Sequence, residues 1–295
     1  MKTLVEHLSE KGLDFLIQKE AIYYGDGTVV PGSYALVRAD NKAFLSLAKG
    51  RYQPVANRYA VSFIDEIVGG DSEASFKARI EKVEGFEGGK KLQVTLKFPE
   101  SYSSRNHTIE KTVVIRNSHD SSEAITACLV VKATDKAGKT VSSNMGNKEF
   151  KCRHTKNVTV KLNTAQATLN LMDSYYLAIQ EDFVALDRVS VGRELLNPLL
   201  DVVAPPTKKG RGASNRLNAE EYLSKVMGSE ERVSLLKVFL ALTDYLNSGR
   251  VFKDESLRDW KACSRDTFLL TRKLFLKTKE LLTLTEGYSY YGGDE

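Results

Sequence analysis

The chain has 295 residues, of which 42% are hydrophobic and 27% charged, and its formal net charge is +5. These values are ordinary for a soluble globular protein with a sizeable core. No apolar run reaches the roughly 18–20 residues that a membrane span needs. The N-terminal segment carries charges every few residues in place of a signal-peptide core. We therefore expect a cytoplasmic protein without a membrane anchor.

The first third of the chain predicts a short helix, a turn-rich segment, a hairpin and a second helix. Apolar residues in 4–16 are spaced as in a short amphipathic helix or helix pair broken near Gly12, and 23–32 is dense in turn formers. The run SYALVRADNKAFLSLAKGRY alternates around an Asp40-Asn41 turn and predicts a β-hairpin. After it, NRYAVSFIDEIVGG has a helical period and ends at two glycines.

The middle of the chain predicts an antiparallel sheet of four or five strands. The strand candidates are SFKARIEKVEG, KKLQVTLKF, KTVVIRNS, EAITACLVVKA and NKEFKCRH, which are β-branched or alternate in polarity. Side chains alternate between the two faces of a strand. In the last candidate, Phe150, Cys152 and His154 therefore share one face, and Lys151 and Arg153 share the other.

The second half of the chain predicts helices. Apolar residues from Leu162 to Leu186 recur every three or four positions, which indicates one long helix packed on the sheet or on another helix, or a coiled-coil contact between copies. Residues 204–217 combine prolines, glycines and basic residues with no acid, and they predict a mobile linker. The expected fold is α+β: a core of antiparallel sheet and packed helices in 1–203, a basic linker in 204–217, a helical region in 218–286 and an acidic tail in 287–295.

Metal and catalytic motifs are not recognisable. Cys128, Cys152 and Cys263 have no CxxC spacing, and the cysteines and histidines lack the short local spacing of a zinc site. We expect neither a metal nor another cofactor. His119 and Asp120 are neighbours in a strand and point to opposite faces, and no established catalytic motif matches. An enzyme that uses His119 and His154 stays open as an alternative.

Basic residues are concentrated between Glu100 and Ala165, where 11 Lys and Arg stand against 6 Asp and Glu. Lys and Arg on an exposed sheet face can neutralise phosphates while aromatic side chains stack on bases. The same alternation also describes an ordinary solvated face. For a nucleic-acid interface, the candidate contacts are Tyr102, Arg105, Arg116, Lys132, Lys151, Arg153, Lys156, Lys208, Lys209 and Arg211.

Four segments resemble the sequence blocks of one family. RYQPVANRYAVSFIDEIVG resembles an RYxPVxNxxAFxFxDEL block, VVIRNSHDSSEAI an NSHDGSxA turn, and CRHTKNVTVKLNTAQATL an IRHTxNxxxRLxxA junction. ALTDYLNSGRVFKD occupies the place of an AVTEYLDH helix. These are blocks of the phage/plasmid-like protein family (domain of unknown function 932), and the resemblance covers roughly residues 34–280. Its motif residues of unknown role are Asn117, His119, Asp120, His154, Thr155 and Asn157.

Two departures from the family pattern stand out. Ser121-Ser122 replaces the usual aspartate-glycine-serine turn, and SSNMGNKEF stands where an RVVCxNTL block is common. The resemblance implies a protein of phages, plasmids or other mobile elements in a bacterial cytoplasm, with no established reaction. By analogy with such elements, we expect a non-enzymatic protein that binds or anneals single-stranded DNA and forms homo-oligomers. The alternative is a protein–protein module that oligomerises through the long helix.

Overall fold

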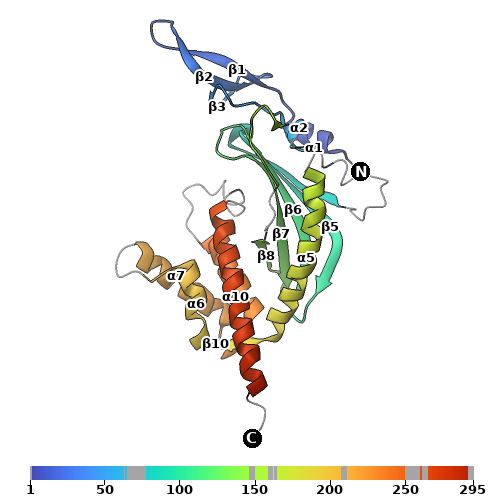
Figure 1. Cartoon of the computed structure of the whole chain (residues 1–295), viewed down its shortest axis with the longest axis vertical. Coiled ribbons are helices and arrows are strands. Elements are labelled where there is room, and N and C mark those ends of the chain that lie inside the picture. Colours follow the sequence, from blue (N-terminus) through green and yellow to red (C-terminus); the bar gives the residue numbers. More distant parts are fainter. Residues whose placement is uncertain are drawn as a thin grey trace. The chain divides into compact units, whose positions relative to one another are not determined.

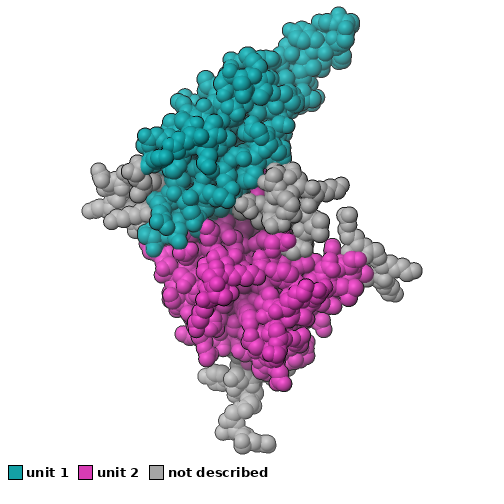
Figure 2. Space-filling model, turned by 180° about the vertical axis from the view of Figure 1, so that it is seen from behind, with its two compact units in different colours: residues 1–99, 112–129, 147–173 teal, residues 100–111, 130–146, 174–295 magenta. Residues whose placement is uncertain are grey.

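The structure is a computed structural model that describes residues 2–62, 64, 78–145, 150–158, 162, 165–206, 211–249, 260 and 265–291. It divides into two compact units, and each is assembled from three separate stretches of chain (Figure 2). Unit 1 comprises residues 1–99, 112–129 and 147–173, and unit 2 comprises 100–111, 130–146 and 174–295. These units do not follow one another along the chain, so their limits differ from the predicted boundary at residue 203.

Unit 1 begins with helix α1 (Leu4–Glu10) and a three-stranded antiparallel sheet of β1 (Ile17–Tyr23), β2 (Val29–Arg38) and β3 (Phe44–Lys49) (Figure 1). A capping box in which Thr3 and Glu6 satisfy each other's backbone N–H groups starts the helix. The predicted hairpin is confirmed as β2 and β3. Strand β1 was not predicted, and the turn-rich segment is the connection between β1 and β2.

The larger sheet has the strand order β4-β5-β6-β7-β8, and β9 pairs with β7. Its strands are β4 (Arg79–Phe86), β5 (Lys91–Ser103), β6 (His107–Ser118), β7 (Ile125–Asp135), β8 (Thr140–Asn144) and β9 (Phe150–Cys152). The long strands β5, β6 and β7 each contribute residues to both units. Every predicted strand is present, and β8 is additional.

The helices of unit 2 surround an aromatic core. They are α5 (Ala165–Arg188, which begins in unit 1), α6 (Asn197–Val203), α7 (Arg211–Met227), α8 (Leu235–Asp244), a π-helical turn (Tyr245–Gly249) and α10 (Arg265–Tyr291). The short strands β10 (Ser190–Gly192) and β11 (Arg232–Ser234) pair with each other. Phe183, Phe239 and Phe275 form the centre, with ring centroids 5.5–5.9 Å apart.

The α+β class is confirmed, whereas two of the predicted C-terminal boundaries are not. Helix α7 begins at Arg211 and occupies the second half of the predicted linker, while 207–210 lie outside the described residues. Helix α10 continues to Tyr291, so most of the predicted tail is helical. No described helix is both long enough and apolar enough to cross a membrane.

The regularly spaced apolar residues of the predicted long helix, called its seam below, are partly buried within the chain itself. Tyr176, Ile179, Phe183 and Leu186 are buried inside unit 2. These side chains are therefore not free to contact a second copy. The preceding seam residues in α5, up to Met172, have side chains outside the described set.

Candidate functional site

Two of the motif segments meet in unit 1 around one buried amide. Asn57, the first residue of the short helix α2 (Asn57–Ala60), donates its Nδ2–H to the carbonyl of Leu13 at 2.8 Å. Its Oδ1 accepts the Nδ2–H of Asn117 at 2.9 Å and lies 2.9 Å from Nε2 of His119. Because an amide oxygen only accepts, Nε2 of His119 carries the proton. One side chain thus joins helix α2, the end of β6 and the segment before β1.

A second set of contacts fixes His154 in the same cluster. Its imidazole stacks on the ring of Tyr52, with a centroid distance of 4.9 Å and an interplanar angle of 14°. The Tyr52 hydroxyl donates to the carbonyl of Ser118 at 3.2 Å, and the backbone N–H of Gln53 donates to the carbonyl of His154 at 2.9 Å. Residues from the RYQPVAN, NSHD and RHT segments are therefore in direct contact.

Both histidines of this cluster are held in the neutral form. Burial, reinforced by the nearby His154, lowers the pKa of His119 to about 3. Burial lowers the pKa of His154 to about 4. Nδ1 of His119 and both ring nitrogens of His154 are buried without a hydrogen-bond partner among the described residues. Within that part of the chain no group of three His, Cys, Asp or Glu residues is placed to hold a metal ion.

Asp120 organises the turn after β6. Its carboxylate accepts hydrogen bonds from the Ser118 hydroxyl at 2.8 Å and the Ser122 backbone N–H at 3.0 Å, and it pairs with Lys91 at 3.1 Å. These donors lower the pKa of the carboxyl against the effect of its burial. Ser121, which stands at the glycine position of the family turn, has a φ of 61°. The turn therefore keeps the left-handed conformation without the glycine that suits it.

A hollow of about 690 Å³ lies beside this cluster, entirely within unit 1. Its floor is apolar and consists of buried residues, namely Val55, Ala56, Val158 and Leu162. Tyr59, which is 59% exposed, and the exposed Gln53 and Lys156 stand around it. Neither His119 nor His154 lines the hollow. The arrangement offers an aromatic ring, an amide and a cation to a ligand at the surface.

The predicted basic residues of the β9 segment lie close to each other in sequence and face solvent. Lys151, Arg153 and Lys156 are exposed, whereas Cys152 and His154 between them are buried. This confirms the predicted alternation of faces. Within the described residues, no carboxylate lies within 4 Å of these three cations. Their charges are thus free to interact with an anionic partner.

Other predicted contacts are placed differently. Arg116 is only 2% exposed and pairs with Glu123 at 3.1 Å, so it is not available to bind phosphate. Tyr102 and Lys132 are half-buried and Arg105 is exposed, and all three belong to unit 2. They therefore form no described surface with the β9 segment.

The remaining predicted residues are at chain turns or outside the described set. Thr155 and Asn157 are exposed, and the carbonyl of Thr155 accepts the backbone N–H of Val158 at 2.9 Å. Lys208, Lys209 and the side chain of Arg211 lie outside the described residues.

Sequence reasoning missed Gln53 and Tyr59. Both belong to the RYQPVANRYA segment, which was recognised only as a family block. A signal was present, because an exposed polar residue and a tyrosine flank the Pro54–Ala56 run at the start of a helix. The helical period alone does not show that the Tyr59 ring is left uncovered.

Comparison with known proteins gives one match. The family described as Domain of unknown function (DUF932) matches residues 44–266. No curated protein and no solved structure gives a significant match. The matched range contains Asn57, the NSHD turn, His154 and Lys156. The chain belongs to the DUF932 family.

Proposed function

We propose that this protein binds single-stranded DNA without catalysing a reaction. The observation that supports the proposal is the hollow of unit 1, which the exposed Tyr59 and Lys156 line together with buried apolar residues. Bases stack on exposed aromatic rings, and Lys and Arg side chains bind the backbone phosphates. Lys151 and Arg153 add two exposed cations in the same segment.

Single strands fit this surface better than a duplex. A tyrosine ring can stack only on a base whose face is accessible, and duplex DNA hides its base faces. The surface offers one ring and a few cations, in place of a helix or ribbon that could enter a major groove. The proposal extends to a role in replication or recombination, including strand annealing, for a phage or plasmid in the host cytoplasm.

Fluorescence anisotropy with a labelled single-stranded oligonucleotide, repeated across a series of salt concentrations, tests the proposal. Replacing Lys151, Arg153 and Lys156 together by Gln should weaken binding and reduce the slope of log K against log salt by about 0.7 for each lost phosphate contact. The matched control is Arg79→Gln, which removes an exposed cation of β4 in the same unit outside the hollow. Equal slopes for the wild type and the triple variant contradict the proposal.

A second variant separates stacking from charge. Tyr59→Ala should reduce the binding free energy by about 1–3 kcal/mol and leave the salt slope unchanged, because base stacking releases no counterions. Tyr59→Phe keeps the ring and should bind as the wild type does. If Tyr59→Ala binds normally while the triple variant does not, the surface is an electrostatic one and the base-stacking part of the proposal is wrong.

A further inference from the structure

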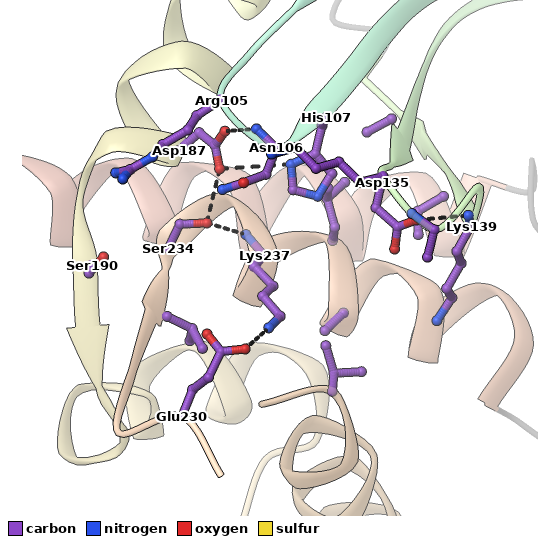
Figure 3. Close-up of a pocket in the computed structure, with 18 of the residues that line it drawn as sticks. Arg105, Asn106, His107, Asp135, Lys139, Asp187, Ser190, Glu230, Ser234 and Lys237 are labelled. Carbon is purple, nitrogen blue, oxygen red and sulfur yellow. Dashed lines mark hydrogen bonds and ion pairs between the residues drawn. The ribbon is translucent and has the colours of Figure 1, made fainter. Parts of the chain in front are cut away.

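Unit 2 contains a separate cavity of about 480 Å³ (Figure 3). The turn between β5 and β6, the hairpin of β7 and β8, and the N-terminal end of α8 form its walls. Its volume is in the range of about 300–1,000 Å³ that is usual for small-molecule sites. Five basic and three acidic residues line it, next to His107.

The most deeply buried acid of the cavity is already satisfied. The Asp187 carboxylate accepts the Asn106 backbone N–H at 3.2 Å and the Ser234 hydroxyl at 3.1 Å (Figure 3). It also accepts the Ser104 hydroxyl at 2.8 Å. Despite the opposing effect of burial, these donors and the nearby His107 hold the pKa of the Asp187 carboxyl well below its usual range. Its negative charge is thus stabilised by donors of the protein, so the carboxylate does not require a cationic ligand.

The other two acids are also engaged within the protein. Glu230 accepts from Lys237 at 2.5 Å, and Asp135 accepts the backbone N–H groups of Ala137 and Lys139 at 2.9 and 2.8 Å in the hairpin turn. Among the described residues, each carboxylate of the cavity therefore already has a hydrogen-bond or ion-pair partner within the protein.

Three cations of the cavity form no ion pair among the described residues. Arg105 and Lys136 are exposed, and within the described part of the chain no carboxylate lies within 4 Å of them or of Arg232. Arg232 only donates to the carbonyl of Ser190 at 2.7 Å. The N-terminal end of α8 adds the positive end of a helix dipole at Ser234. The cavity as a whole favours an anion.

The same cavity is lined by a buried polar atom that has no hydrogen-bond partner among the described residues. The His107 side chain is 9% exposed and lines the cavity, and its Nδ1 lies 3.7 Å from Oδ1 of Asp187, which is too long for a hydrogen bond. This imidazole is therefore a polar part of the cavity lining, with its Nδ1 near the Asp187 carboxylate. The apolar wall of the cavity consists of Val141, Val226, Val233 and Leu240.

We propose that this cavity binds a mononucleotide, with the phosphate at Arg105, Lys136 and Arg232 and the base against the apolar wall. Inorganic phosphate alone leaves that wall uncovered, and a nucleoside alone leaves the three cations unpaired. The site is independent of the DNA-binding hollow proposed for unit 1.

Isothermal titration of the full-length protein with deoxyadenosine 5′-monophosphate, deoxyadenosine and inorganic phosphate tests the site. The monophosphate should bind at least tenfold more tightly than either of the other two probes. Arg105→Ala and Lys136→Ala should each raise its Kd about tenfold, and Val226→Gln should raise it as well. Lys273→Ala, which removes an exposed cation of α10 outside the cavity, is the matched control and should have no effect.

The outcomes separate this site from the proposed DNA interface. Tyr59→Ala should leave monophosphate binding unchanged, because Tyr59 belongs to unit 1. Loss of monophosphate binding in Tyr59→Ala, equally tight binding of inorganic phosphate, no binding of the monophosphate, or no effect of Arg105→Ala and Lys136→Ala each overturns the proposal. The two charge variants alter exposed side chains, and circular dichroism checks that they remain folded.

Discussion

The imidazole of His154 lies almost parallel to the ring of Tyr52, at a centroid distance of 4.9 Å, and His154 is buried while Tyr52 is half-buried. Burial raises the pKa of the Tyr52 hydroxyl, while it lowers that of His154. Both groups are therefore neutral around pH 7. Together with His119, which burial also keeps neutral, they form a polar cluster that depends on the absence of charge.

Acid should destabilise the protein through these two histidines. Their pKa values are about 3 for His119 and about 4 for His154 in the folded state, against 6.5 for an ordinary histidine. Below pH 6.5 the unfolded chain binds protons that the folded chain does not, so the unfolding free energy falls as the pH falls. From pH 7 to pH 5 we expect a loss of roughly 1–2 kcal/mol for each histidine. Urea denaturation at pH 5, 6, 7 and 8 measures it.

The control for this prediction removes the titrating groups. In His119→Gln and His154→Gln the neutral amide cannot take up a proton, so each variant should lose part of the dependence between pH 5 and 7. An unfolding free energy of the wild type that stays constant over this interval contradicts the prediction.

Asn57 should be a large contributor to the stability of unit 1. In Asn57→Ala, the carbonyl of Leu13 and the donors of Asn117 and His119 lose their shared partner inside the protein. A buried polar group without a hydrogen bond costs about 1–3 kcal/mol, so chemical denaturation should show a loss at the upper end of that range or beyond. The exposed Asn41→Ala, at the hairpin turn, should have an effect below about 1 kcal/mol. Similar losses for the two variants contradict the proposed role.

The strands of the larger sheet were predictable because β-branched runs and alternation are properties of the local sequence. The solvent-facing side of β9 followed from the same rule, and Lys151 and Arg153 are indeed exposed. Arg116 lies in a strand that is buried over its whole second half, where alternation does not distinguish inside from outside. Its burial depends on Glu123, a partner from beyond the following turn. Sequence reasoning has no access to such a pairing.

The site itself was less predictable than the fold. The family blocks identified Asn117 and His119, yet their contacts with Asn57 are made between distant segments, as is that of Tyr52 with Ser118. The basic composition of 204–217 predicted a linker, but helix α7 starts at Arg211. Ala, Asn, Arg and Leu allow a helix when one of its sides packs on the rest of unit 2. Ala219 and Leu223 provide that packed side.

Replacing Ser121 by glycine should stabilise the turn after β6. A non-glycine residue in the left-handed region costs roughly 1–2 kcal/mol, and the φ of Ser121 is 61°. Ser121→Gly removes this strain but increases the freedom of the unfolded chain, which offsets about 0.4–1 kcal/mol. We expect a net stabilisation of up to about 1 kcal/mol, seen as a higher denaturation midpoint. Ser122→Gly, whose hydroxyl and N–H contact Asp120, should destabilise the turn instead. A lower midpoint for Ser121→Gly contradicts this account.

Asp187 should stabilise unit 2 through its charge as well as its shape. Ser104, Asn106 and Ser234 donate to its carboxylate, which joins the β5–β6 turn and the start of α8 to the end of α5. Asp187→Asn keeps the size but turns one acceptor into a donor that faces other donors, so the unfolding free energy should fall by about 2–3 kcal/mol at pH 7. The lowered pKa of Asp187 means that its contribution is complete above the ordinary carboxyl pKa of 3.8 and is lost as the pH falls below it. The difference in unfolding free energy between wild type and variant should therefore be constant from pH 5 to 8 and shrink below pH 4.

The control is Asp201→Asn, which changes an exposed acid paired with Arg216 and should alter the unfolding free energy by no more than about 1 kcal/mol. If Asp187→Asn lowers the unfolding free energy by no more than Asp201→Asn does, the charge of Asp187 does not stabilise unit 2.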